Sequence, residues 1–266
     1  MSMGNYATVN GHPIYYEQFG DGRPIVLLHG GLHTIHLSFE KQIAPFAEQH
    51  HVIAIEQVGH GHSADIEGPF SYMQMAEDTA ALLRQLNITN ADFVGWSDGG
   101  ILSLILARRH PTLVRRLVIS GANIRAEGLK AETLTYFRET PSDQIAKDFS
   151  GLRAAYEQTS PDGSDHWPIV VAKIVNMIIT PVILEQSDLA AIQAHVLVVA
   201  GDRDAITLEH TIELFESLPQ AQLCILPGTG HETFQKAADR LNPMILAFLD
   251  APMTTPGVVA AASAAT

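Results

Sequence analysis

Residues 93–100 read Phe-Val-Gly-Trp-Ser-Asp-Gly-Gly, and this stretch decides the fold. It opens with a short apolar run, and an amphipathic pattern follows over residues 102–109. We therefore predict a buried strand, a sharp turn at Ser97 and then a helix. Glycines are needed on both sides of the serine because side chains there would collide with neighbouring backbone. The positive potential at the helix N-terminus would stabilise negative charge that develops near the Ser97 hydroxyl.

Four further apolar runs resemble the one before Ser97, and each is bounded by glycine or polar residues. Such runs are typical of parallel strands buried on both faces. Helical periodicity lies between them, for example over residues 75–86, which indicates βαβ units. We predict the α/β class with a doubly wound, mostly parallel sheet. An Asn-Gly pair at residues 10–11 also predicts an N-terminal hairpin. The five runs are residues 25–28, 52–55, 93–96, 116–119 and 196–199.

The alternation of strand-like and helical patterns stops between residues 123 and 188, where a helical spacing of apolar residues is interrupted by prolines. We predict that this stretch is a small helical cap over the strand ends, the alternative being ordinary packing helices. Residues 1–122 and 189–250 would then form one α/β core. Residues 251–266 have no periodicity, and we expect a disordered tail there.

Composition restricts the partners. The 266 residues are 46% hydrophobic and 17% charged, which is enough for a substantial core. The formal net charge of −13 disfavours binding to nucleic acid or to a membrane surface, and favours neutral or cationic small substrates. The single cysteine, the absence of a signal-peptide pattern at residues 1–9 and the absence of a long apolar run predict a cytoplasmic protein.

A serine nucleophile needs a base and an acid that orients the base. Residues 201–206 read Gly-Asp-Arg-Asp-Ala-Ile, so either Asp202 or Asp204 could be the acid. We favour Asp204, because Asp202 is closer to the strand end and can fix the turn. His231 follows in the glycine-rich stretch 227–232. The order of nucleophile, acid and histidine predicts Ser97, Asp204 and His231 as catalytic residues.

Residues 29–32, His-Gly-Gly-Leu, follow an early strand and predict an oxyanion hole. Its donors would be the backbone N–H groups of Gly31 and Asp98, with Leu32 as an alternative to Gly31. We expect the His29 ring to brace this loop. The candidate substrate contacts are Leu32, Asp98 and Trp167, although Trp167 could instead pack inside the cap.

No cofactor or metal is predicted. Residues 60–65, His-Gly-His-Ser-Ala-Asp, resemble a metallo-β-lactamase motif only superficially, because the aspartate is displaced and the last histidine is absent. The motif H-E-x-x-H is absent, since no glutamate follows His29, and neither G-x-G-x-x-G nor G-x-x-x-x-G-K-[ST] occurs.

With these motifs in place, the chain resembles the α/β-hydrolase superfamily over residues 6–249. Residues 95–101 and 121–123 are similar to the valacyclovir hydrolase (biphenyl hydrolase-like) branch. The resemblance implies hydrolysis of carboxylic esters, including amino-acid esters, and implies that Asp98 attracts a substrate ammonium group. One departure is residues 56–63, Glu-Gln-Val-Gly-His-Gly-His-Ser, where many relatives have Asp-x-Arg-Gly-x-Gly-x-Ser. The arginine of a structural ion pair is therefore missing from this loop.

We expect an esterase that acts on small or medium substrates through an acyl-enzyme on Ser97. Lactone hydrolysis or carbon–carbon bond cleavage would need the same three residues and stays open. A ligand-binding module without turnover is the alternative of another class. The expected partner is a small-molecule ester, and the sequence leaves the oligomeric state open.

Overall fold

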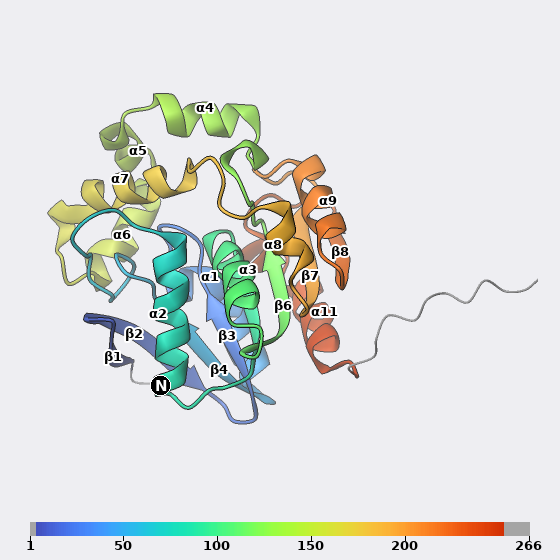
Figure 1. The fold of residues 1–266 in the computed structure, drawn as a ribbon. Helices are drawn as coiled ribbons and strands as arrows, with labels where there is room; N and C mark the ends of the chain where they lie inside the picture. The colour runs from blue at the N-terminus through green and yellow to red at the C-terminus, as the bar shows by residue number, and fades with distance from the viewer. Residues whose placement is uncertain (1–3, 253–266) are drawn as a thin grey trace, which may run out of the picture.

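The computed structural model describes residues 4–252, which form an eight-stranded sheet with helices on both faces (Figure 1). The strand order is β1-β2-β4-β3-β5-β6-β7-β8. The first two pairings, β1 with β2 and β2 with β4, are antiparallel, and the others are parallel. The predicted hairpin and all five predicted strands are confirmed. The strands are β1 (Asn5–Val9), β2 (His12–Phe19), β3 (Arg23–Leu28), β4 (His50–Ile55), β5 (Ala91–Trp96), β6 (Val114–Ser120), β7 (His195–Gly201) and β8 (Ala221–Leu226).

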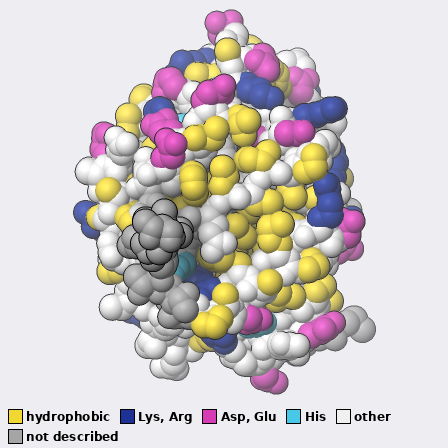
Figure 2. All heavy atoms as spheres, turned by 90° about the vertical axis from the view of Figure 1, so that its right-hand side faces the viewer, with side chains coloured by type: hydrophobic (Ala, Val, Ile, Leu, Met, Phe, Trp, Pro, Cys, Tyr) yellow, Lys and Arg dark blue, Asp and Glu magenta, His cyan; other side chains and the backbone are white. Residues whose placement is uncertain are grey.

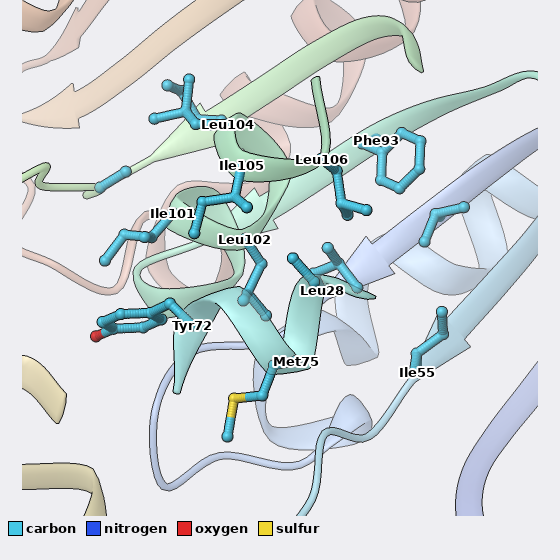
Figure 3. Packing of buried hydrophobic residues seen from close by; sticks show 14 of the residues in the cluster. Leu28, Ile55, Tyr72, Met75, Phe93, Ile101, Leu102, Leu104, Ile105 and Leu106 are labelled. Atoms are coloured by element: carbon cyan, nitrogen blue, oxygen red, sulfur yellow. The ribbon is translucent and has the colours of Figure 1, made fainter. Parts of the chain in front are cut away.

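Each central strand is apolar on both faces because the sheet lies between two layers of helices. In β3, Val26 and Leu28 belong to one hydrophobic core, and Ile25 and Leu27 belong to the other. Figure 3 shows the first core, in which side chains of β3, β4 and β5 meet those of α2 and α3. That face carries α2 (Tyr72–Gln85), α3 (Asp98–Arg109), α8 (Gln186–Ala190) and α9 (Leu208–Ser217), and the other carries α1 (Ile35–Ala47), α10 (Thr233–Lys236) and α11 (Ala238–Asp250).

Residues 123–188 contain helices and contribute no strand to the described sheet. They lie beyond the end of the sheet from which α3 starts (Figure 1). Helix α7 is the most buried of them, whereas α4 has no buried residue. The segment begins three residues after the end of β6 and ends within α8. Its other elements are η1 (Ala126–Gly128), α4 (Ala131–Glu139), α5 (Ser142–Asp148), α6 (Ser150–Thr159), η2 (Ser164–His166) and α7 (Trp167–Ile178).

Two expectations concern the chain as a whole. The tail expected at residues 251–266 falls outside the described residues from position 253 onward. Among residues 4–252, no helix combines the length and the apolar character that crossing a membrane requires.

Candidate active site

Ser97 lies at the turn between β5 and α3, in a conformation that a non-glycine residue rarely adopts. Its φ is 53° and its ψ is −119°, and its N–H donates to the Ser120 carbonyl over 2.7 Å. Two positions later the chain passes so close to β3 that a side chain is impossible, since a Cβ on Gly99 would lie 1.9 Å from the Leu28 carbonyl oxygen. The glycine-flanked motif therefore allows a tight turn that holds the serine at the sheet end.

The structure brings Ser97, His231 and Asp204 together. Nε2 of His231 lies 3.0 Å from Oγ of Ser97, and Nδ1 lies 2.7 Å from Oδ1 of Asp204. Asp204 also accepts a hydrogen bond from the Ile206 N–H over 3.0 Å. Asp202 is exposed and instead accepts from the Thr229 N–H over 3.2 Å. Asp204 is thus the aspartate that contacts the imidazole, and Asp202 fixes the turn, as the sequence suggested.

The hydrogen bonds determine which ring nitrogen of His231 carries the proton. Asp204 is a carboxylate with a lowered pKa; burial raises that pKa, but hydrogen bonding and the charge of His231 outweigh burial. Nδ1 therefore donates to Asp204, which leaves Nε2 free to accept the Ser97 hydroxyl proton. The pKa of His231 is raised, because the hydrogen bond and charge of Asp204 outweigh the lowering caused by desolvation.

Trp96 holds the histidine loop in place. Its indole Nε1 donates to the His231 carbonyl over 2.8 Å, and the two rings lie 5.3 Å apart. On the other side of the loop, the hydroxyls of Ser120 and Thr233 are 2.7 Å apart. Trp96 was not among the predicted site residues, although its position directly before the serine was a usable signal.

The loop at residues 29–32 lies beside the serine. A Cβ on Gly31 would lie 2.6 Å from Oδ2 of Asp98, so a side chain at position 31 would displace the Asp98 carboxylate. The buried His29 ring braces the loop as expected. Its Nε2 accepts from the Gln57 N–H over 3.0 Å, and Nδ1 therefore carries the proton that is donated to the Gly30 carbonyl over 2.8 Å. Burial lowers the pKa of His29 well below its ordinary value, so this ring stays neutral.

Glu56 organises the loop that departs from the usual pattern. Its side chain is almost fully buried and accepts from the Ile35 N–H over 3.2 Å and from the His62 N–H over 2.6 Å. Nδ1 of His62 lies 3.0 Å from the same carboxylate. An imidazole therefore partners this acid, in the loop from which the arginine of many relatives is missing.

A cavity of about 450 Å³ opens beside the three residues. Leu32 and Asp98, two of the expected substrate contacts, line it together with Gly31 and Ser97. Its wall is mainly apolar, and the helical segment supplies much of it. The apolar lining residues from that segment are Leu129, Phe137, Phe149, Leu152, Val175 and Ile178. The cavity also contains polar residues that were not predicted from the sequence, namely His33, Asn123, Thr133 and Glu232.

Trp167 does not line this cavity, which corrects one expectation. The ring is 1% exposed and packs against Tyr156, with the two ring centres 5.3 Å apart. Its Nε1 donates to the Ala146 carbonyl over 2.9 Å. The indole thus anchors α7 to the neighbouring helices, since both its apolar surface and its N–H are satisfied inside the segment.

Asp98 combines burial with an unmet hydrogen-bonding capacity. The Tyr72 hydroxyl donates to Oδ1 over 2.8 Å, whereas Oδ2 is buried and has no partner among the described residues. Burial raises the pKa of Asp98 to about 6, although the Tyr72 hydrogen bond and the charge of His231 act in the opposite direction. The carboxylate could therefore accept a hydrogen bond from a ligand in the cavity.

Metal-binding residues do not gather in the described part of the chain. Within residues 4–252, no three His, Cys, Asp or Glu side chains are arranged to hold a metal ion.

Comparison with known proteins agrees with this geometry. The family described as alpha/beta hydrolase fold matches residues 23–165. The chain is 27% identical over 252 residues to the human protein "Serine hydrolase BPHL", covering 91% of this chain and 84% of that protein. It is 29% identical to "2-hydroxymuconate semialdehyde hydrolase" of Pseudomonas putida, covering 86% and 88%.

A solved structure, "Est816 as an N-Acyl homoserine lactone degrading enzyme", is similar with a TM-score of 0.76 and 26% identity, covering 92% of this chain and all of that chain. The matched segment contains strands β3 to β6, the glycine-flanked serine and the loop at residues 29–32, which are among the features that the sequence resemblance rested on. The chain belongs to the alpha/beta hydrolase fold family.

Proposed function

We propose that this hydrolase cleaves carboxylic esters through an acyl-enzyme on Ser97. The observation that carries the proposal is the hydrogen-bonded chain from Ser97 through His231 to Asp204. Ser97 Oγ attacks the ester carbonyl carbon while its proton passes to Nε2 of His231. The alcohol then leaves and takes this proton. His231 next removes a proton from water, which attacks the acyl carbon; the bond to Ser97 Oγ then breaks, His231 passes the proton to Oγ, and the carboxylic acid leaves.

Negative charge on the carbonyl oxygen has to be stabilised in both steps. We assign this role to the backbone N–H groups of Gly31 and Asp98. Both residues line the cavity beside Ser97, and Asp98 is the first residue of α3, where the helix dipole also favours negative charge. The bare glycine at position 31 supports the assignment, since it lets the loop come close to Asp98, the residue after the serine.

Residues 123–188 act as a cap that selects the substrate. The aromatic and aliphatic side chains that this segment places in the cavity favour an apolar acyl or alcohol group of small or medium size. Asp98 would add a preference for an ammonium group next to the ester, as in amino-acid esters. Its unpartnered Oδ2 supports this preference, as does the absence of lysine and arginine from the wall of the described cavity.

The decisive experiment is fluorophosphonate labelling of the wild type and of Ser97→Ala, with turnover of p-nitrophenyl acetate measured alongside. We expect label and turnover to disappear together, with kcat falling by on the order of 10⁴ or more. Folding of the variant is checked by circular dichroism. Turnover that survives in folded Ser97→Ala would refute the assignment, and a folded wild type that neither labels nor turns over would favour a ligand-binding module.

The bond that is cleaved needs a separate measurement. A panel of simple esters, amino-acid esters, lactones and ring-cleavage diketones gives kcat/KM for each class on the same triad. We expect esters to be preferred. A preference of more than about tenfold for lactones or diketones, equivalent to about 1.4 kcal/mol in transition-state binding, would replace the ester assignment while leaving the roles of the three residues intact.

A further inference from the structure

The cavity beside Ser97 contains a second polar side chain whose hydrogen-bonding capacity the triad does not use, that of His33. Neither ring nitrogen of His33 has a hydrogen-bond partner among the described residues; Nδ1 is closed off from solvent, whereas Nε2 is accessible. Hydrophobic side chains also gather on the face of β8, α9 and α11 (Figure 2), but no residue that lines the groove there, within the described chain, has a buried polar atom of this kind. A polar group without a partner in an apolar cavity is costly and points to a ligand.

The loop holds the His33 ring in a defined place. Leu32 adopts the left-handed conformation, with a φ of 63°, and the His33 N–H donates to the Gly30 carbonyl over 3.2 Å. The next residue, Thr34, caps α1 with its side chain. The imidazole packs against Trp96, with the two ring centres 4.5 Å apart and the ring planes at 71°. Such a strained turn, fixed on both sides, is typical of residues that position a ligand.

The His33 ring is neutral at any pH at which His231 can act as a base. Burial lowers the pKa of His33 to about 4; the charges of His231 and His60 act in the same direction and outweigh that of Glu232. The tautomer with its proton on Nε2 is favoured, because a buried N–H at Nδ1 would have no acceptor, and such orphaned donors are rare. His33 therefore presents an uncharged N–H donor to the cavity.

The neighbours of His33 indicate which part of the substrate it meets. The rings of His33 and His231 both pack against Trp96, at 4.5 and 5.3 Å between ring centres. The alcohol part of an ester has to lie at His231, because its oxygen takes the proton from Nε2. Asp98, the proposed partner of an ammonium group in the acyl part, lies instead beside Tyr72 of α2. His33 is thus on the alcohol side of the scissile bond.

We propose that His33 is a specificity-determining residue, whose Nε2–H donates a hydrogen bond to an uncharged oxygen in the alcohol part of the ester. An ether or hydroxyl oxygen a few bonds beyond the scissile bond fits this position. The inference rests on the proposed ester hydrolysis and adds a substrate class, the esters of alkoxy- and hydroxy-alcohols. An uncharged oxygen is favoured over an anion, because the ring carries no charge and the carboxylate of Glu232 lines the same cavity.

The test compares two isosteric esters of one acid, 2-methoxyethyl isovalerate and n-butyl isovalerate, in which an ether oxygen replaces a methylene group. The ratio of their kcat/KM values is measured in the wild type, His33→Phe and His33→Gln. We expect the ratio to fall about 3–10-fold in His33→Phe, the size of a neutral hydrogen bond, and to be largely kept in His33→Gln, whose amide N–H can replace Nε2–H. Comparison with the wild type cancels the different intrinsic reactivity of the two alcohols.

Three controls assign the effect to the alcohol part and to His33. With the ether oxygen moved into the acyl part, in n-butyl 3-methoxypropanoate against n-butyl pentanoate, His33→Phe should leave the ratio unchanged. His12→Phe is the matched variant, since His12 begins β2 and does not line the cavity. The wild-type ratio should also stay constant as pH falls through the pKa of Asp98, because His33 remains neutral there.

Circular dichroism checks folding, and His33→Leu replaces His33→Phe if the phenyl ring prevents folding. An unchanged ratio in a folded apolar variant, including equal losses for both isovalerates, would overturn the role of His33 and leave the ester proposal intact. An equal fall in the acyl-ether ratio would overturn the assignment to the alcohol side. A wild type that hydrolyses no ester would overturn the proposed function and this inference together.

Discussion

At the scale of single residues, His231 is subject to two opposing effects. Burial disfavours the imidazolium, whereas the hydrogen bond to Asp204 and the charge of that carboxylate stabilise it, and the net result is a raised pKa. A histidine that acts as a base has to be neutral, so activity should rise with pH as His231 loses its proton. The acid limb of kcat/KM is therefore expected above the ordinary histidine pKa of about 6.5.

Asp204→Asn tests this account. The amide no longer stabilises the imidazolium, while desolvation still lowers the histidine pKa, so the acid limb should move to lower pH. The amide also fails to hold the proton on Nδ1, and kcat should fall by on the order of 10⁴. The measurement is a pH profile of kcat/KM for a neutral ester. Asp202→Asn is the control, since Asp202 binds the Thr229 N–H. An unchanged acid limb in Asp204→Asn would contradict the assignment of the limb to His231.

Asp98 gives a second prediction, which rests on the proposed preference for ammonium groups. In Asp98→Asn the backbone N–H and the contact with Tyr72 can persist, but the negative charge is lost. We expect kcat/KM for valine methyl ester to fall about 10–100-fold, the size of a charge-assisted hydrogen bond, and that for methyl isovalerate to change less than about threefold. The two esters differ only in the amino group.

The same residue predicts a pH dependence of selectivity. The pKa of Asp98 is raised to about 6, so the carboxyl is neutral below that pH and ionised above it. The preference of the wild type for the amino-acid ester should therefore decline as pH falls through about 6. Equal losses for both esters in Asp98→Asn would show that the residue supports the oxyanion loop and does not bind ammonium.

At the scale of elements, the buried strands were the most predictable part of the fold. Their short apolar runs with glycine boundaries leave few other conformations, because both faces of the sheet are covered. Helix α1 was missed, since it contains Pro45 and a non-helical Phe39 that disturb the periodicity.

The meeting of Ser97, Asp204 and His231 could also be predicted, because their motifs lie directly after strands and the ends of parallel strands meet at one edge of the sheet. The residues that line the cavity could not be predicted in the same way. Phe137 and Trp167 are both aromatic residues of the same segment, yet one faces the cavity and the other is buried among helices. That difference depends on how the helices pack against one another. The hydrophobic periodicity of the sequence does not specify this packing.

Helix α7 is tied to the core by a charged cluster around Asp65. Nζ of Lys173 lies 2.7 Å from both carboxylate oxygens, and Nε2 of His166 lies 2.7 Å from one of them. The Asp65 side chain is only 7% exposed. Burial alone would raise the pKa of Asp65. The hydrogen bonds and the charge of its partners lower this pKa by more, so the net shift is downward. This stabilisation is present above the unfolded pKa of about 3.9 and is lost as pH falls through the folded pKa.

We predict that Lys173→Met destabilises the protein by about 2 kcal/mol, less than the ~3–5 kcal/mol of fully buried pairs because Lys173 retains some solvent contact. The measurement is urea unfolding of the wild type, Lys173→Met, Asp65→Asn and the double variant. The double variant should lose less stability than the sum of the losses in the two single variants. Each single variant leaves one charge of the Lys173–Asp65 pair without its partner, whereas the double variant removes both charges. Lys147→Met, at an exposed site on α5, is the control. Strict additivity would mean that the cluster does not couple α7 to the core.

At the scale of the whole molecule, the protein carries a net charge of −13. The described wall of the cavity beside Ser97 has carboxylates but no lysine or arginine. Such a field enriches cations near the surface and depletes anions. Salt screens it, as the Debye length falls from about 30 Å at 0.01 M to about 3 Å at 1 M. Long-range attraction of a cationic ester should therefore depend on ionic strength, and the short contact with Asp98 should depend on it less.

We predict that kcat/KM for a choline ester falls severalfold, up to about tenfold, as sodium chloride is raised from about 10 mM to about 500 mM. A neutral ester of the same acid should change little, and an anionic ester should gain. The comparison of three substrates separates the field from any effect of salt on the enzyme itself, because such an effect would alter all three in parallel. A cationic ester as insensitive as the neutral one would mean that the charge of the molecule as a whole contributes nothing to substrate capture, and that selectivity is confined to contacts inside the cavity.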